Sequence, residues 1–211
     1  MPKLALILCA VWVLLLVVVR AIMQWNSMGS TGIKGFRGRL GSLEWFAEIT
    51  ASIGLILVPI APIVTLRQWS FGELLFDRTS IHQFGALLVI AGIAGALAAQ
   101  ITMGDSWRVG VDKSERTSLV TNGIYQWVRN PIFSFIGISI LGYALVIPNL
   151  WVLLAMVLVF VGVQIQVRFV EEPYLLTLHG EKYQSYAASI GRFLPALGKS
   201  RYSKRNRGAV K

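Results

Sequence analysis

The sequence has few of the residues that soluble and secreted proteins use to hold a fold together. Its one cysteine, Cys9, lies inside an apolar run, so no intrachain disulfide and no cysteine-based zinc cluster can form. Charged residues make up only 14% of the 211 residues, whereas hydrophobic residues make up 55% and the mean hydropathy is +0.63. A soluble domain of this size would not tolerate that balance, so the composition predicts an integral membrane protein.

Acidic residues are also scarce, because ten Asp and Glu stand against twenty Lys and Arg. The cations lie in loops and in the C-terminal tail rather than along a face studded with aromatic residues, which argues against a nucleic-acid partner. A membrane surface is the better partner, and the basic tail 197–211 is predicted to bind anionic headgroups. No small-residue cleavage site follows the first apolar run, so we expect this run to stay as a helix rather than to act as a signal peptide.

Apolar runs of membrane-crossing length recur along the chain. A hydrocarbon core of about 30 Å needs about 20 apolar residues in a helix. This length predicts helices near residues 4–22, 45–66, 81–103, 132–147 and 150–170. The sequence shows no internal repeat and no soluble domain. The predicted fold class is therefore all-α and integral to the membrane, with five transmembrane helices and a C-terminal interfacial helix.

The basic residues of the loops predict how these helices are oriented. The loop after the first helix carries three cations and no acid before Glu44, the loop 104–130 carries four, and eight Lys and Arg follow Glu181. Cytoplasmic loops are enriched in Lys and Arg, so all three segments are predicted to be cytoplasmic. We expect the protein in the plasma membrane of a prokaryote, with its C-terminus inside.

Polar residues gather directly before the fourth predicted helix, in the stretch NGIYQWVRNPIFSF, 122–135. Asn130 can accept hydrogen bonds from the free amides of that helix, and Pro131 suits its first position because proline lacks an N–H. The amides, the helix dipole and Arg129 together favour an anionic group. The alternative is an ordinary capped helix with an arginine at headgroup depth.

A second polar group lies where the fifth predicted helix ends. Gln164, Arg168 and Glu171 are spaced i, i+4 and i+7, so they would share one face of an α-helix. Glu172 follows Arg168 by four residues and would lie on the same side. Polar side chains at membrane depth are costly and point to a functional site, although a structural Arg–Glu pair would look the same.

The chain after this helix is punctuated by Pro173 and by a His-Gly pair, and then shows helical spacing again. Tyr183, Tyr186 and Ile190 recur on one side, which predicts an amphipathic helix at the membrane interface. The turn IPNL, 147–150, makes the fourth and fifth helices a tight hairpin, so the two polar groups meet at one edge. They would form a pocket for a zwitterion.

The motifs SLVTNGIYQWVRNPIF and, about forty residues later, RFVEEPYLLTLHGEKYQSYAASIGRFLP resemble the isoprenylcysteine carboxyl methyltransferase family and its prokaryotic relatives. GDSWRVGVD, 104–112, resembles the stretch before the first motif, and the likeness covers about residues 104–195. The resemblance divides the chain into a three-helix region 1–103, a methyltransferase-like region 104–196 and the tail 197–211. It implies methyl transfer from S-adenosylmethionine to a lipophilic acceptor, with an isoprenoid or lipid carboxylate favoured.

The resemblance also assigns site residues. It implies that Arg168 and Glu171 are catalytic, with Arg168 orienting an acceptor carboxylate, whereas an amine acceptor would pair with Glu171 or Glu172. The residues that it implies for the cofactor are Gly123, Tyr125, Arg129, Asn130, Pro131, Glu172, Tyr183 and Tyr186. Asn130 stands where the family usually has histidine, so a role in positioning the cofactor is expected there rather than acid–base chemistry.

Two other functions fit the same features. One is a membrane sterol or isoprenoid reductase, which would use NADPH and need further cations for its phosphate. The other is a non-catalytic scaffold or channel, in which the polar residues would line a path or a helix contact.

Overall fold

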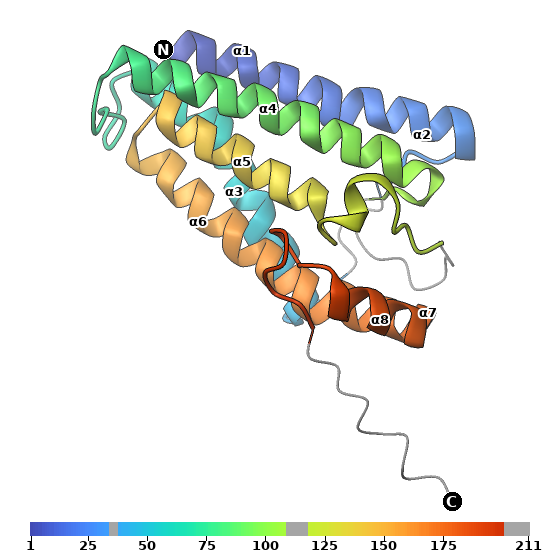
Figure 1. Ribbon diagram of the computed structural model, residues 1–211. Helices are drawn as coiled ribbons and strands as arrows, with labels where there is room; N and C mark the ends of the chain where they lie inside the picture. Colours follow the sequence, from blue (N-terminus) through green and yellow to red (C-terminus); the bar gives the residue numbers. More distant parts are fainter. Residues whose placement is uncertain (34–37, 109–117, 201–211) are drawn as a thin grey trace, which may run out of the picture.

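A computed structural model describes residues 1–33, 38–108 and 118–200 (Figure 1). Every regular element in this part of the chain is helical. The first helix comprises α1 (Pro2–Val13), a π-helical turn (Leu14–Val19) and α2 (Arg20–Met28) without a break. The other long elements are α3 (Leu43–Leu66), α4 (Thr79–Met103), α5 (Pro131–Val146) and α6 (Leu150–Ile165).

Short helices follow α6 without a break or flank the long ones. A π-helical turn, Gln166–Glu171, joins α6 to α7 (Glu172–His179), and α8 (Glu181–Ser189) comes next. The expected interruption at Pro173 is wrong, because the helix continues to His179. Pro173 occupies the first turn of α7, where a missing N–H is tolerated, and the wider π-helical turn precedes it.

Four helical stretches are long and apolar enough to cross a membrane: Pro2–Met28, Leu43–Leu66, Thr79–Ser106 and Leu150–His179. α5 is apolar but only 16 residues long, which is short for a span. The described part of the chain therefore confirms an all-helical integral membrane protein with four candidate spans. A fifth crossing by α5 stays a prediction.

The long helices pack as two close pairs, α4 with α5 and α3 with α6. In the first pair a Cβ added to Gly142 would lie 2.6 Å from the Gly85 carbonyl oxygen. In the second pair a Cβ added to Gly162 would lie 2.6 Å from the Ala51 nitrogen. Small residues thus let the backbones approach closely, as is common between helices in membranes.

The predicted turn between α5 and α6 is confirmed, and Asn149 organises it. Its Oδ1 accepts from the Val152 amide at 3.0 Å, which caps α6. Its Nδ2 donates to the Ala61 carbonyl and to the Thr65 hydroxyl, both at 3.0 Å. One buried side chain therefore holds the start of α6 against the end of α3.

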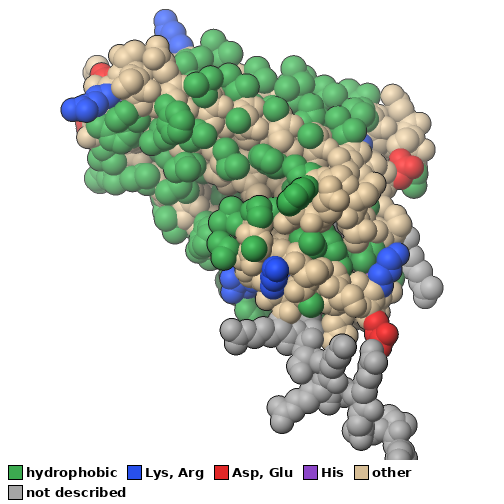
Figure 2. Space-filling view, in the orientation of Figure 1, with side chains coloured by type: hydrophobic (Ala, Val, Ile, Leu, Met, Phe, Trp, Pro, Cys, Tyr) green, Lys and Arg blue, Asp and Glu red, His purple; other side chains and the backbone are tan. Residues whose placement is uncertain are grey.

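The outer surface is apolar. Figure 2 shows hydrophobic side chains over this face of the helices, with Lys and Arg near the two ends of the molecule. Large side chains such as Ile56, Leu87 and Phe160 are more than half exposed. Lipid is the solvent that suits such a surface. Figure 1 also shows α6 slanting away from α1, α2 and α4 toward the end that carries α7 and α8.

Candidate active site

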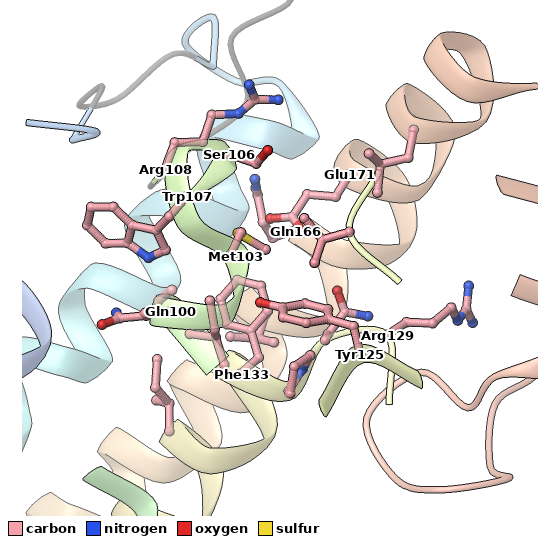
Figure 3. Close-up of a pocket in the computed structure, with 18 of the residues that line it drawn as sticks. Gln100, Met103, Ser106, Trp107, Arg108, Tyr125, Arg129, Phe133, Gln166 and Glu171 are labelled. Carbon is pink, nitrogen blue, oxygen red and sulfur yellow. The ribbon is translucent and has the colours of Figure 1, made fainter. Parts of the chain in front are cut away.

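A cavity of about 540 Å³ lies where the helix pairs diverge (Figure 3). Its size is that of a small-molecule site. Every long helix contributes to its wall, together with the 3₁₀ turn Gly123–Gln126 and α8. The cavity therefore draws residues from both halves of the sequence, including the first helix, for which the sequence predicted no role.

One part of the cavity is apolar. Its lining side chains come from the first helix, α3, α5 and α6, and they are Trp12, Leu16, Val17, Ala51, Leu55, Ile136, Val159 and Val163. These residues belong to helices long enough to cross a membrane, or to α5, which packs along one of them. This wall is suited to hydrocarbon chains.

The other part is polar and lies toward α7 and α8. It contains the cations Arg108 and Arg129, the carboxylate of Glu171, the amide of Gln166 and four tyrosines, Tyr125, Tyr174, Tyr183 and Tyr186. Figure 3 shows Glu171 and Gln166 reaching the cavity from the same helix, with Met103 and Tyr125 nearby. A single cavity thus joins a hydrocarbon-like wall to a charged end.

The π-helical turn decides which polar residues enter the cavity. Gln166 and Glu171 line it, whereas Arg168 and Gln164 line a separate outer depression with Phe160. The predicted common face of Gln164, Arg168 and Glu171 is therefore not formed. Five residues separate hydrogen-bonded partners in a π-helix instead of four, so spacing along an α-helix no longer gives the right side.

Glu172 does not line the cavity and is not paired with Arg168. Its Oε1 lies 3.0 Å from Arg129 Nη1 and accepts from Arg192 Nε at 2.7 Å, while its Oε2 accepts from Arg192 Nη2 at 2.9 Å. Arg129 also donates from Nη2 to the Gly198 carbonyl at 2.8 Å. Arg129, Arg192 and Glu172 together thus hold the segment 190–200 against the start of α5.

Asn130 and Pro131 both line the cavity at the start of α5. Pro131 occupies the first turn as predicted, but the predicted side-chain cap is wrong. Asn130 Nδ2 donates instead to the Arg192 carbonyl at 3.1 Å, which the Asn130 amide also bonds at 3.0 Å. The amide nitrogen thus bonds a segment that is distant in sequence, and the side chain makes no cap bond to the amides of α5.

α8 covers the site rather than lying free on the membrane surface. Tyr183 and Ala187 are buried, and the Tyr186 hydroxyl donates to the Tyr125 carbonyl at 2.6 Å. Arg129 Nη1 donates to the Tyr183 hydroxyl at 3.4 Å. Burial raises the pKa of Tyr125 and of Tyr183, and it raises the pKa of Tyr186 to about 12. All three phenols are therefore neutral donors near pH 7.

Gly123 shapes the loop without lining the cavity. Its φ is +55°, and an added Cβ would lie 2.9 Å from Thr102 Cγ2. Glycine is thus required for the turn that leads into Tyr125.

The tail 197–211 starts within the folded part, because Gly198 and Ser200 are both bonded to it. Its residues from 201 onward, with most of its cations, lie outside the described residues, as do 109–112 of the motif GDSWRVGVD.

Several site residues were missed from the sequence. Gln166 lies between Gln164 and Arg168 in the sequence, but α-helical spacing does not place it on the face predicted for them. Gln100 lies in the last turn of the apolar helix α4, and its Nε2 donates to the Leu16 carbonyl at 3.1 Å. Arg192 lies at the RFLP end of the second motif, and nothing in the sequence indicated that its partner is Glu172.

The cavity fits a polar cofactor. Gln100 Oε1, Arg129 Nε and Gln166 Oε1 belong to lining side chains, and these atoms are buried without a hydrogen-bond partner among the described residues. Buried polar groups are normally bonded, so these atoms are suited to a ligand. A cationic donor and two acceptors complement the carboxylate, ammonium and hydroxyl groups of S-adenosylmethionine.

Residues 80–182 match the model of the family described as Phospholipid methyltransferase. No curated protein matches the chain. The family is a relative of the isoprenylcysteine carboxyl methyltransferases, so the resemblance drawn from the motifs holds for the wider group and not for that family itself. The match decides against a reductase and against a non-catalytic scaffold or channel. Over residues 80–182 the chain is thus similar to phospholipid methyltransferases, and it is an integral membrane methyltransferase that uses S-adenosylmethionine.

Proposed function

We propose that the protein methylates the amine of a phospholipid headgroup at the cytoplasmic face of the membrane. The observation that carries this proposal is the position of Glu171, whose carboxylate enters a cavity that also has a hydrocarbon-like wall. An acid beside a lipid-binding wall suits an amine better than a carboxylate acceptor. Arg108, in the polar part of the cavity with Glu171, is a cation that suits the lipid phosphate.

The family match supports a phospholipid acceptor and gives no support to an isoprenoid carboxylate. The position of Arg168 argues the same way. This residue was expected to orient an acceptor carboxylate, yet it lines the outer depression and not the cavity. We therefore assign binding of the methyl acceptor to Glu171 and give Arg168 no role in the site.

We assign the cofactor side to the start of α5 and to α8. Arg129 Nε and the first amides of α5 would hold the cofactor carboxylate, and Asn130 would keep this end of the helix in place through Arg192. Tyr125, Pro131, Tyr183 and Tyr186 form the surrounding wall. Gly123 and Glu172 act from outside the cavity, the first through the loop and the second through Arg129.

S-adenosylmethionine supplies an activated methyl group, so the protein mainly has to align the reacting atoms. The amine nitrogen forms its new bond to the methyl carbon while the carbon–sulfur bond breaks and leaves both electrons on sulfur. The nitrogen then carries an extra proton, and the Glu171 carboxylate accepts that proton and passes it to water. The apolar wall holds the acyl chains so that the headgroup reaches this carboxylate.

The same proposal includes the placement in the membrane. α5 would be the fifth crossing, because it packs along α4 from the site to the opposite end, where His82 of α4 contacts the Leu145 carbonyl at 2.9 Å. The loop 104–130 and the C-terminus would then lie on one side. The charge of the loops makes this side cytoplasmic, in the plasma membrane of a prokaryote.

The experiment is methyl transfer by the purified protein from labelled S-adenosylmethionine to vesicles of defined lipids. We expect label in ethanolamine phospholipid, and none in phosphatidylglycerol or in a prenylated carboxylic acid. Glu171→Gln should lower kcat by about a hundredfold, within the range of a lost general base, and should keep binding to S-adenosylhomocysteine. Label that appears only as a base-labile ester would contradict an amine acceptor.

A further inference from the structure

Gln166 has a role that the proposed function does not yet use. It stands at the first position of the π-helical turn, and Glu171 stands at the last. The two residues are therefore i and i+5, the spacing that a π-helical turn brings together. Both side chains reach the cavity (Figure 3), so the turn presents them to the ligand as a pair.

The amide of Gln166 has a fixed orientation. The Gln166 side chain interacts with the Glu171 carboxylate. A carboxylate only accepts, so the amide nitrogen is the atom that faces Glu171 and can bond to it. The carbonyl oxygen Oε1 must then face away from that bond. Oε1 is buried and has no partner among the described residues. The cavity wall thus presents two neighbouring acceptors, the Glu171 carboxylate and Gln166 Oε1.

We propose that Gln166 is a specificity-determining residue that, with Glu171, binds the two N–H groups of an unmethylated amine. A neutral primary amine has two N–H bonds and one lone pair. With both N–H groups bonded to the acceptor pair, the lone pair is directed to the methyl carbon. This inference rests on the proposed function, because it assumes an amine acceptor.

The number of N–H groups falls with each methyl transfer. A primary amine offers two, a monomethylated amine one and a dimethylated amine none. The charged Glu171 is the stronger acceptor, so it takes the single N–H that remains after the first transfer. Gln166 Oε1 therefore matters for the first methylation and has no partner in the third. In each transfer one N–C bond forms and one C–S bond breaks. In the first two transfers the proton released from nitrogen goes to Glu171, whereas in the third the nitrogen becomes a quaternary ammonium and releases no proton.

The test compares Gln166→Met with Gln164→Met. Both changes replace an amide with an apolar side chain of similar length on the same helix, but Gln164 lines the outer depression. The substrates are ethanolamine, monomethylethanolamine and dimethylethanolamine phospholipids in detergent micelles, and kcat/KM is measured for each. Gln166→Met should lower kcat/KM about tenfold for the unmethylated lipid, the loss of one hydrogen bond, and leave the value for the dimethylated lipid nearly unchanged. Gln164→Met should change neither.

Three results would overturn the inference while leaving the proposed function standing. They are an unchanged kcat/KM for every lipid, an equal loss for all three, and a loss confined to the dimethylated lipid. An equal loss would mean that Gln166 only holds Glu171 in place.

If Gln166→Met does not fold, the KM of the wild-type protein for the three lipids tests the inference instead, because this KM should rise with each methyl group already on nitrogen. A KM that does not rise contradicts the inference. A wild-type protein that labels no amine lipid would instead refute the proposed function itself.

Discussion

Glu172 and Arg129 form a buried ion pair, with 3.0 Å between Oε1 and Nη1 and with 8% and 1% of the two side chains exposed. Arg192 shares the same carboxylate through two N–H groups. The cluster joins three parts of the chain that are far apart in sequence: the loop before α5, the start of α7 and the segment after α8. It therefore fixes the start of α5, where the cofactor is proposed to bind.

We expect Glu172→Gln to act on stability first. Removing one partner of a buried pair typically costs about 3–5 kcal/mol, because it leaves charge without compensation. In a chain of this size that loss lowers Tm by roughly 6–20 °C. Thermal unfolding in detergent measures it, and Glu181→Gln in the exposed first turn of α8 is the control. A fall in cofactor affinity with unchanged Tm would support direct cofactor binding by Glu172.

Asn130 should tolerate histidine but not leucine. Asn130→His keeps a donor for the Arg192 carbonyl, whereas Asn130→Leu loses it and leaves the start of α5 less well held. The net loss of one hydrogen bond weakens binding of S-adenosylhomocysteine by up to about tenfold. Calorimetry on the purified variants measures this, with the exposed Asn122→Leu as the control. Equal affinities for the leucine and histidine variants would remove Asn130 from the site.

Filling the apolar part of the cavity should block the lipid and spare the cofactor. Ser52 of α3 lines the cavity, whereas its neighbour Ile53 is 47% exposed on the outer surface. Ser52→Trp should raise the KM for phospholipid about tenfold or more, because the larger side chain competes with the acyl chains. Ile53→Trp should have little effect. If Ser52→Trp changes cofactor affinity and not the lipid KM, the two sides of the cavity have been assigned the wrong way round.

The orientation can be tested with single cysteines. Cys9→Ala removes the only native thiol, and Ser70→Cys or Ser185→Cys then adds one at an exposed position on either end of the molecule. A maleimide that cannot cross membranes should label Ser70→Cys in intact cells and label Ser185→Cys only after lysis. The reverse pattern would place the site outside the cell.

The sequence predicted those features that depend on local composition. Apolar runs of membrane length gave the long helices, because burying them in lipid needs only their hydropathy. The turn at 147–150 and the first turn of α5 followed from Pro and Asn, whose backbone preferences act within a few residues. Seven of the ten site residues that the motifs implied line the cavity, including Tyr125, Arg129 and Glu171.

What the sequence could not predict depends on helix register and on distant partners. A π-helical turn has no clear signal in a pattern of period 3.6, so Arg168 was placed in the site and Gln166 was left out. Asn130 looked like a cap, because the competing carbonyl belongs to Arg192, about sixty residues later. The role of the first helix was also missed, since Leu16 and Gln100 meet only through packing.

The unbroken helix from Leu150 to His179 also sets the depth of Glu171 in the membrane. At about 1.5 Å per residue, Glu171 lies about 31 Å along the axis from Leu150, which matches a hydrocarbon core of about 30 Å. With Leu150 at one boundary of that core, the carboxylate stands at the other, level with the headgroups of one leaflet, which we propose to be the cytoplasmic one. A phospholipid can then react in its own leaflet, by lateral diffusion, without being pulled out of the bilayer. The length of the helix thereby matches the enzyme to a bilayer of one thickness. In a membrane thinner or thicker by several ångströms, the headgroup would no longer lie level with the Glu171 carboxylate.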